Sequence, residues 1–393
     1  MRSRNPSATR PLPFGYPSTT LRLRSGQALR ASAQGPRSRS AGQRPTNQKI
    51  RCWVSLSLNP TYIYFFNVQL FKKQPTTNNQ QQITMAKLTA IGTALTMVFL
   101  ILIAAIAPRE TYAGPVTVAG DNYILEFNHI YFEVNAQIGG RITTFSLDGK
   151  NVLTGPSVNP DNYGSTFWTS PQSDWDWPPI PEIDNLPYEG TVEGDTIILQ
   201  GQVSPELGVS ITKEFSPDLA NDAIVLHYSI NNESAESVTY APWEISRVGA
   251  TDAIVFYPTG EGGYDSGPFD LPKITEAKGI TWVEYHREFN DQKLFADGSD
   301  GWLASLTDRQ LFIRSFVDIP PEEQAPGEGE IEIYFNGPTT YVEVEPQGPY
   351  QEILPGESLS WTVTWYLRNL PPKIPAKVGS KKLIKFVQRT VDS

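Results

Sequence analysis

A tryptophan-rich segment is the feature of this sequence that points most directly to chemistry. Between Gly164 and Pro187, Trp168, Trp175 and Trp177 lie close to the polar side chain of Gln172. Indole faces stack on the C–H faces of sugar rings, while amides and carboxylates form directional hydrogen bonds with hydroxyl groups. The segment therefore predicts a pocket for a neutral, polyhydroxylated ligand. The alternative is that the indoles only cap the end of a β-sandwich.

Two further segments carry acidic side chains at spacings that suit acid–base chemistry. Glu343 and Glu345 are two residues apart, so on a strand both project from the same face, and their repulsion raises the pKa of one of them. In APWEISR, strand alternation puts Trp243 on one face and Glu244 on the other, with Arg247 nearby. The alternatives are a solvated acidic strand face in the first segment and a surface ion pair of little energetic value in the second.

Histidine and cysteine limit the other chemistries. Of the three histidines, His286 in WVEYHREF is the best placed for proton transfer. No two histidines have the local spacing of zinc ligands. The single cysteine, Cys52, excludes a disulfide framework and a cysteine-based metal site. We predict neither a metal nor a cofactor.

These side chains need a rigid scaffold, and the apolar pattern predicts one made of strands. Turn residues separate short runs in which apolar and polar residues alternate, and helical apolar stripes are missing. The predicted strands are residues 123–127, 130–134, 141–145, 196–199, 223–230, 311–316, 331–335, 341–345 and 359–366. We predict an all-β fold, a large sandwich of antiparallel sheets. Gly164–Pro187 and Gly260–Asp291 break the strand pattern and are predicted to be long binding loops.

Charge divides the chain into unlike parts. Residues 1–84 contain 13 Lys/Arg and no Asp/Glu, whereas residues 114–393 contain 17 Lys/Arg and 41 Asp/Glu. The resulting charge of −24 repels a phosphate backbone, which excludes a nucleic-acid partner, and it argues against uronate polymers as substrates. The first 84 residues have no apolar period, so we predict that they are disordered or lie outside the translated protein.

Residues 85–113 have the anatomy of a secretory signal peptide. Lys87 supplies a positive charge, Leu88–Ala107 is almost continuously apolar, and small residues precede Gly114. The alternative is a membrane anchor, since the apolar stretch is long enough to span a bilayer. We predict a monomeric domain over residues 114–370, followed by a basic tail over residues 371–393. The domain is then periplasmic or secreted, or membrane-anchored if residues 88–107 are not removed.

Three segments together resemble the galactose mutarotase-like (aldose 1-epimerase-like) superfamily, over most of Gly120–Leu367. They are GGRITTFSLDGKNVL, KEFSPDLANDAIVLHYSINNESAESVTYAPWEISR and YVEVEPQGPYQEILPGESLSWTVTWYL. The resemblance implies a β-supersandwich with a sugar in its cleft and a catalytic base at the position of Glu343. Where that family has a catalytic His, this chain has Trp243-Glu244. The combination of GSTFWTSPQSDWDWPP with APWE looks like an uncharacterised bacterial branch.

The leading hypothesis is an exported domain that binds a neutral carbohydrate, with aldose epimerisation as its enzymatic form. In that form Glu343 is the base, and either His286 or Glu244 is the acid. The predicted substrate-binding residues are Trp168, Gln172, Trp175, Trp177, Trp243, Arg247 and Glu345. The rival hypotheses are a non-catalytic glycan-binding or cell-envelope protein and an enzyme that cleaves polysaccharides.

Overall fold

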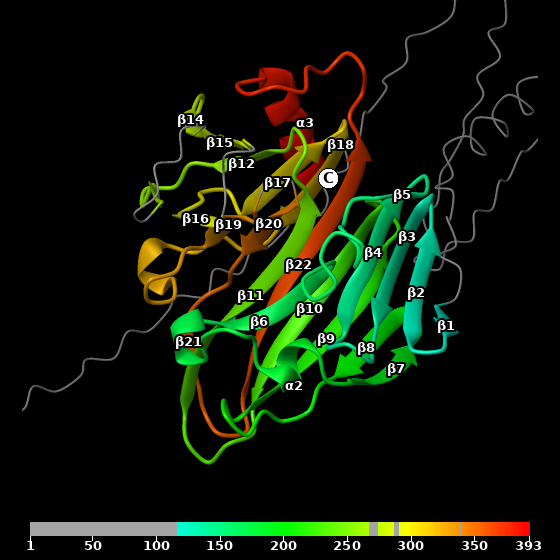
Figure 1. Cartoon of the computed structure of the whole chain (residues 1–393), viewed down its shortest axis with the longest axis vertical. Helices are drawn as coiled ribbons and strands as arrows, with labels where there is room; N and C mark the ends of the chain where they lie inside the picture. The colour runs from blue at the N-terminus through cyan, green and yellow to red at the C-terminus, as the bar shows by residue number, and fades with distance from the viewer. Residues whose placement is uncertain (1–115, 267–273, 287–290, 338–339) are drawn as a thin grey trace, which may run out of the picture. The chain divides into compact units, whose positions relative to one another are not determined.

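Two large antiparallel sheets dominate the molecule (Figure 1). The structure is a computed structural model that describes residues 116–266, 274–286, 291–337 and 340–393. The predicted leader and signal segment lie outside the described residues. Within the described part of the chain, no helix combines the length and the apolar character needed to cross a membrane.

The first sheet has twelve strands, ten of which follow the order β1-β2-β3-β4-β6-β11-β20-β19-β16-β13, while β5 pairs with β4 and β21 pairs with β11. Its strands are β1 (Thr117–Ala119), β2 (Asn122–Phe127), β3 (Ile130–Asn135), β4 (Arg141–Leu147), β5 (Lys150–Asn151), β6 (Ser165–Ser170), β11 (Val238–Gly249), β13 (Tyr264–Asp265), β16 (Gln292–Ala296), β19 (Ile331–Phe335), β20 (Tyr341–Pro346) and β21 (Gln351–Ile353).

The second sheet has ten strands in the order β14-β15-β12-β17-β18-β22-β10-β9-β8-β7. These strands are β7 (Glu189–Glu193), β8 (Thr196–Gln200), β9 (Val209–Asp218), β10 (Ala223–Asn232), β12 (Ile254–Pro258), β14 (Ile274–Glu276), β15 (Ile280–Glu284), β17 (Trp302–Thr307), β18 (Gln310–Ser315) and β22 (Ser358–Asn369). The helical elements are η1 (Gln172–Asp174), α2 (Pro181–Asp184), η2 (Pro321–Glu323) and α3 (Lys381–Val391).

The two sheets pack face to face around an aromatic core. Along β3 every second residue is buried, as the alternation of its sequence requires when one face is covered. Phe132 of β3 and Phe145 of β4 lie 6.2 and 5.3 Å from Trp365 of β22 in the opposite sheet, measured between ring centroids. The sandwich is therefore held by large apolar side chains that meet between the sheets.

The predicted fold class, an all-β sandwich of antiparallel sheets, is confirmed. All nine predicted strands are present within three residues of their expected ends. Two predicted loops contain strands as well: β6 occupies the start of Gly164–Pro187, and β13, β14 and β15 lie within Gly260–Asp291. These strands were missed because they are short or buried on both faces, so they show no alternation.

Strands whose residues are buried on both faces mark the places where the outer face of a sheet is covered. Every residue of β6 and of β20 is buried, as is most of β11. In the other sheet, β17 and β18 are also almost wholly buried, because α3 packs its apolar side on them. The basic tail predicted for residues 371–393 is thus partly a helix that belongs to the packed structure.

Candidate functional site

The candidate site lies on the face of the twelve-stranded sheet that points away from the ten-stranded sheet. Glu244 of β11 points toward the ten-stranded sheet, where Tyr228 and Trp365 donate hydrogen bonds to its carboxylate. Because successive side chains on a strand alternate between faces, Trp243 and Arg247 point to the opposite side. We call this side the outer face of the twelve-stranded sheet.

Four indole rings meet on this outer face. Trp168 of β6 and Trp243 of β11 are paired across the two strands, and their ring centroids lie 5.3 Å apart. Trp175 lies 5.7 Å from Trp168 and 6.4 Å from Trp243, and Trp177 lies 6.1 Å from Trp168. Trp243 is 1% exposed, whereas Trp177 is 57% exposed. The structure thus brings together the four tryptophans selected from the sequence and leaves one of them open to solvent.

The segment after β6 is tied to its surroundings near both ends. Near its start, the backbone N–H of Gln172 donates to Oε1 of Glu328 at 3.0 Å. Near its end, Asp184 accepts a hydrogen bond from Nε1 of Trp168 at 2.8 Å and forms an ion pair with Arg141 at 3.2 Å. Gln172 therefore contributes a backbone contact that fixes the tryptophan-bearing loop.

A buried ion pair lies beside the indoles. Nε of Arg247 on β11 donates to Oε1 of Glu343 on β20 at 2.8 Å, and the two residues are directly paired across the strands. The guanidinium also donates to Thr166 at 3.2 Å and lies 5.5 Å from the ring centroid of Trp168. The Glu343 side chain retains 9% exposure, whereas that of Arg247 has none. Glu343 is consequently the member of the pair that a ligand can reach.

A second charged group surrounds Lys293 of β16. Its ammonium forms ion pairs with Glu332 and, at 3.3 Å, with Glu345, and it lies 4.5 Å from the ring centroid of Trp243. Nε1 of Trp243 donates to the same Oε2 of Glu345 at 2.9 Å. The indole, the ammonium and the two carboxylates therefore form one continuous group on the outer face.

Burial controls the protonation of this group. Burial raises the pKa of Glu345 to about 7, although the nearby ammonium of Lys293 opposes the shift. For Lys293 itself, burial acts to lower the pKa, but the carboxylates of Glu332 and Glu345 outweigh it and raise the pKa above its ordinary value. Near neutral pH, Glu345 can therefore hold or release a proton beside a permanently charged lysine.

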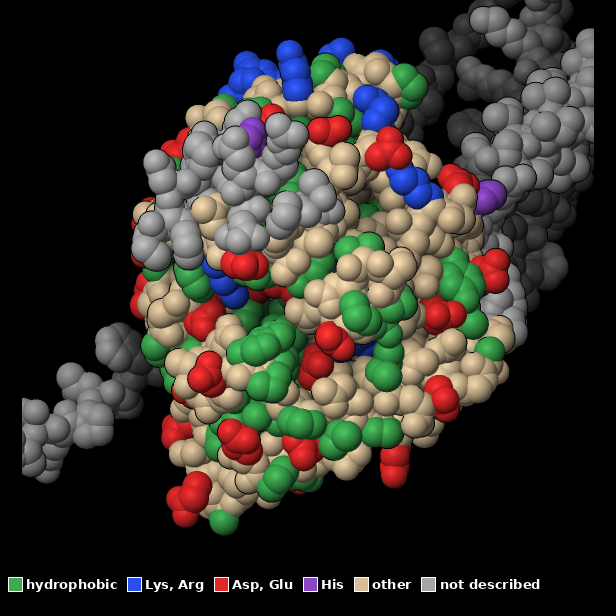
Figure 2. All heavy atoms as spheres, viewed as in Figure 1, with side chains coloured by type: hydrophobic (Ala, Val, Ile, Leu, Met, Phe, Trp, Pro, Cys, Tyr) green, Lys and Arg blue, Asp and Glu red, His purple; other side chains and the backbone are tan. Residues whose placement is uncertain are grey.

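Several buried polar atoms around the indoles have no hydrogen-bond partner among the described residues. They include Nη2 of Arg247, Oε1 of Glu345 and Oε1 of Gln347. Buried polar atoms are costly when unpaired, so water or a ligand usually satisfies them. Figure 2 shows that the surface over β11, β19 and β20 is hollowed, with acidic side chains at the bottom, a basic one at the rim and hydrophobic ones alongside. The hollow thus offers both donors and acceptors next to aromatic surface.

Glu244 is not part of this site. Its Oε1 accepts from Trp365 at 2.9 Å, its Oε2 accepts from Tyr228 at 3.1 Å, and Nε of Arg314 lies 3.9 Å from Oε1. Alternation correctly puts Glu244 on the face opposite Trp243, but that face is the interior of the sandwich. Glu244 is fully buried there, so it cannot act on a ligand bound at the outer face.

His286 lies two residues beyond β15, which belongs to the ten-stranded sheet, whereas Glu343 and Glu345 belong to the twelve-stranded sheet. Its role as the acid stays a prediction. Glu244 cannot serve as the acid beside Glu343, because Glu343 pairs with Arg247 on the outer face and Glu244 points to the interior.

Lys293 and Glu332 are the site residues that the sequence analysis missed. Glu332 lies in the predicted strand Ile331–Phe335, where a charged side chain sits between two buried isoleucines. A glutamate in such an apolar strand could have been recognised as a site candidate, because a glutamate that is buried requires a charged or hydrogen-bonding partner. Lys293 gave no such signal, since its strand is short and follows a predicted loop. Among the described residues, no group of three or more His, Cys, Asp or Glu side chains has the arrangement of a metal site.

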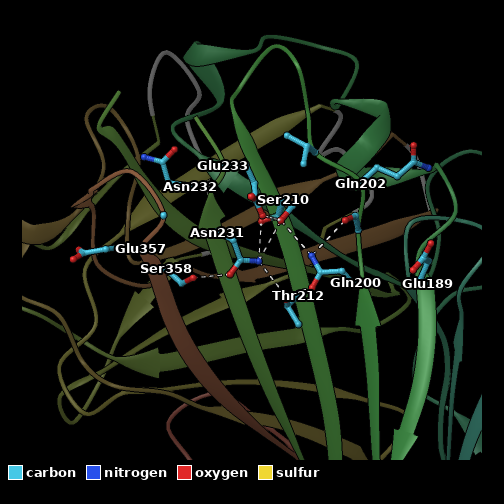
Figure 3. A pocket seen from close by; sticks show the side chains of 13 residues that line it. Glu189, Gln200, Gln202, Ser210, Thr212, Asn231, Asn232, Glu233, Glu357 and Ser358 are labelled. Carbon is cyan, nitrogen blue, oxygen red and sulfur yellow. Dashed lines mark hydrogen bonds between the residues drawn. The ribbon is translucent and has the colours of Figure 1, made fainter. Parts of the chain in front are cut away.

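A groove of about 630 Å³ lies elsewhere, on the outer face of the ten-stranded sheet (Figure 3). Hydroxyl and amide side chains of adjacent strands line it and bond to one another: Thr212 donates to Gln200 at 2.7 Å, Asn231 to Thr212 at 2.9 Å and Ser358 to Asn231 at 2.7 Å. Its lining contains no aromatic residue. We call it the polar groove and do not assign the candidate site to it, because it offers no surface on which a sugar can stack.

Comparison with known proteins supplies a family. A family model described as a domain of unknown function (DUF4380) matches residues 172–368, which is half of the chain. The chain belongs to the DUF4380 family. The matched region of this DUF4380 protein begins in the tryptophan-bearing loop and includes β11, β16, β19 and β20, so it contains most of the candidate site. No curated protein matches the chain in sequence.

Several solved structures are similar to this DUF4380 protein. A galactose mutarotase related enzyme from Lactobacillus acidophilus has 10% identity and a TM-score of 0.47, covering 65% of this chain and 99% of its own. A galactose mutarotase-like protein from Lactobacillus casei has 11% identity and a TM-score of 0.46, covering 63% and 100%. A TPR-domain containing protein from Parabacteroides distasonis has 15% identity and a TM-score of 0.46, covering 65% of this chain. The chain spans only 49% of that protein's length. The first two structures are named for galactose mutarotase, as is the superfamily that the sequence resembles.

Proposed function

We propose that the outer face of the twelve-stranded sheet binds a neutral carbohydrate. One observation carries the proposal: four indole rings are contiguous, one of them is open to solvent, and buried charged groups adjoin them. Exposed Trp177 supplies a stacking surface, and the carboxylate of Glu343 can accept hydrogen bonds from hydroxyl groups. Few other ligand classes need both an apolar ring face and several directional polar contacts at once.

The local charges support a neutral ligand. The cations Arg141, Arg247 and Lys293 are each already paired with a carboxylate. An anionic ligand would have to compete with those buried carboxylates for the same cations, in a domain whose sequence charge is −24. A neutral sugar needs no such exchange, because its hydroxyl groups can donate to carboxylates that stay in place.

A glycan array tests the proposal with the chain that begins at Gly114. We expect binding to neutral glycans, weakened in Trp177→Ala and largely retained in the matched variant Trp177→Phe, which keeps a flat aromatic ring. Gln200→Ala, in the polar groove, serves as the control for a change elsewhere on the surface. Binding confined to anionic glycans, or binding unaffected by Trp177→Ala, would contradict the proposal.

A second candidate function is aldose epimerisation at the same site. The observation that favours it is the pKa of Glu345, which burial raises to about 7, on the same strand face as Glu343. A carboxyl group that is partly protonated near neutral pH can donate a proton and later accept one, and ring opening needs only such an acid and a base, without a cofactor. Glu343 would supply the second carboxyl group, held in place by Arg247.

Polarimetry separates the two candidates. If the site is catalytic, wild type accelerates the mutarotation of fresh α-D-glucose or α-D-galactose, and both Glu343→Gln and Glu345→Gln lose most of that acceleration. If the wild type binds a sugar on the array but does not exceed the buffer rate, the site is a binding site only. Circular dichroism of each variant verifies that the fold is retained.

We further propose that the domain is exported, by removal of residues 85–113 as a signal peptide. The basis is the sequence alone: Lys87, the apolar stretch Leu88–Ala107 and the small residues before Gly114. N-terminal sequencing of the protein recovered outside the cytoplasm tests it. A first residue at or next to Gly114 supports cleavage, whereas a chain that retains residues 88–107 in the membrane fraction supports the anchored alternative.

A further inference from the structure

The C-terminal segment concentrates the positive charge of the domain. Residues 373–389 contain six Lys/Arg and no Asp/Glu, whereas residues 114–372 contain 11 Lys/Arg and 40 Asp/Glu. All six basic side chains are exposed, and Figure 2 shows blue side chains gathered at the top of the molecule, where Figure 1 places α3. We call these six residues the basic patch: Lys373, Lys377, Lys381, Lys382, Lys385 and Arg389.

Four other cations of the domain lie in its interior. Arg141, Lys213, Arg247 and Arg314 are buried, so they contribute little to the surface potential. Two exposed cations, by contrast, adjoin the patch. Lys278 donates to the backbone carbonyl of Gly379, and Arg309 donates to the carbonyls of Leu370 and Pro371. The positive surface thus extends from α3 onto the neighbouring turns of the ten-stranded sheet.

Helix α3 presents only its charged side to the outside. Leu383, Ile384 and Val387 are buried on the sheet, in a cluster that includes Trp302. The burial of these apolar side chains holds the helix on the sheet with its apolar side turned inward. Ser380 caps its first turn by accepting from the backbone N–H of Leu383. The apolar side is therefore not available for insertion into a partner.

The charged side forms a straight, rigid row. Lys381, Lys385 and Arg389 follow one another at intervals of four residues, so they lie along one side of the helix over about 12 Å. Clusters of four to eight Lys/Arg on a helix are typical of surfaces that bind anionic lipid headgroups. A rigid row of cations suits a flat array of negative charges better than it suits a single small anion.

We propose that the basic patch docks the domain on an anionic lipid membrane by electrostatic contact, without insertion. This proposal rests on the export proposed above, in which the apolar stretch Leu88–Ala107 takes the chain to a membrane as a signal peptide or holds it there as an anchor. The acidic body of the domain is repelled from such a surface, but salt screens charges beyond about 8 Å. Only the orientation with α3 toward the lipid is then favourable.

Vesicle sedimentation tests this proposal with the chain that begins at Gly114. Both sheets and α3 lie within residues 116–393, so this chain keeps the whole described fold. We expect binding to vesicles that contain phosphatidylglycerol and none to vesicles of phosphatidylcholine alone. Lys381→Glu/Lys382→Glu/Lys385→Glu should weaken binding by about 100-fold or more, at roughly fivefold per lost positive charge.

Two controls keep the result specific. The triple variant with Arg at the same three positions keeps the charge and should bind like the wild type, and raising the ionic strength should release both proteins from the vesicles. Urea denaturation verifies that the Glu variant remains folded. Equal binding to neutral and anionic vesicles, or binding to soluble polyphosphate with none to vesicles at low salt, would overturn the proposal.

Discussion

The outer faces of the two sheets both carry many polar side chains, but they differ in how these side chains are buried and paired. On the twelve-stranded sheet, the outer face of β11 and β20 carries buried indoles and buried ion pairs such as Arg247–Glu343. On the ten-stranded sheet, the polar groove is lined by hydroxyl and amide side chains and by three glutamates, and each of Gln200, Thr212 and Asn231 bonds to a neighbour on the next strand. Charged side chains occur on both faces, but they are buried on the first and exposed in the groove.

The difference shows why polar lining alone is a poor guide to a site. In the polar groove, neighbouring side chains and solvent already form the hydrogen bonds of the polar groups. A ligand that replaced these hydrogen bonds would therefore gain little binding free energy. On the other face, atoms such as Nη2 of Arg247 and Oε1 of Glu345 are buried without a partner in the described part of the chain. A ligand gains most where the protein has already removed polar atoms from water and positioned them.

The largest expected effect comes from breaking the buried ion pair. Arg247→Met leaves the carboxylate of Glu343 without its partner, so we expect the free energy of unfolding to fall by about 3–5 kcal/mol, measured by urea denaturation. Adding Glu343→Leu to the same chain removes the unpaired charge and should restore part of the loss. A fall of less than about 1 kcal/mol in the single variant would show that this face tolerates the loss of a polar partner as well as the polar groove does.

The pH dependence of stability gives the next effect. The folded-state pKa of Glu345 is raised from 4.5 to about 7, so the folded protein binds its proton more tightly than the unfolded chain does. Its contribution to stability is therefore full below about pH 4.5 and is lost as the pH rises toward 7. Compared with the wild type, Glu345→Gln should lose less stability over this range, with a difference of at most about 1.4 kcal/mol per pH unit. Denaturation curves at several pH values measure it, with Thr212→Ala as the non-titrating control.

A smaller effect is expected where the indole cluster meets solvent. Trp177→Ala should weaken the binding of a neutral glycan by about fivefold, because stacking on an aromatic ring is worth on the order of 1 kcal/mol. Stability should change by no more than about 0.5 kcal/mol, because the side chain is mostly exposed. Titration calorimetry with a glycan found on the array measures the change in affinity, and urea denaturation measures the change in stability. A large loss of stability would mean that the ring supports the fold and not the ligand.

The smallest effect belongs to the polar groove. Asn231→Ala removes its hydrogen bonds to Thr212 and Ser358, but water can replace them on this face, so we expect a loss of less than about 1 kcal/mol and no change in glycan binding. The same urea and calorimetry measurements apply. Loss of glycan binding in this variant would move the candidate site from the indole cluster to the groove.

Strand alternation carried most of what could be predicted. It located nine strands, it placed Glu343 and Glu345 on one face, and it separated Trp243 from Glu244. It failed where a strand is covered on both faces: β6 reads as loop because all six of its residues are buried. The burial of both faces at β6, β11 and β20 marks the candidate site, and this burial can be recognised only after the sheets are known.

The sequence alone determined the class of fold, the separation of charge between the C-terminal segment and the rest of the domain, and the residues that bear the indoles. These are local properties, set by side-chain type and by a period of two. Only the tertiary structure decided which strands lie side by side. It placed Lys293 of β16 against Glu345 of β20, two strands away, and it turned Glu244 toward Trp365 in the interior. Such neighbours are far apart in sequence, and they are selected by the packing of two complete sheets, which no local pattern contains.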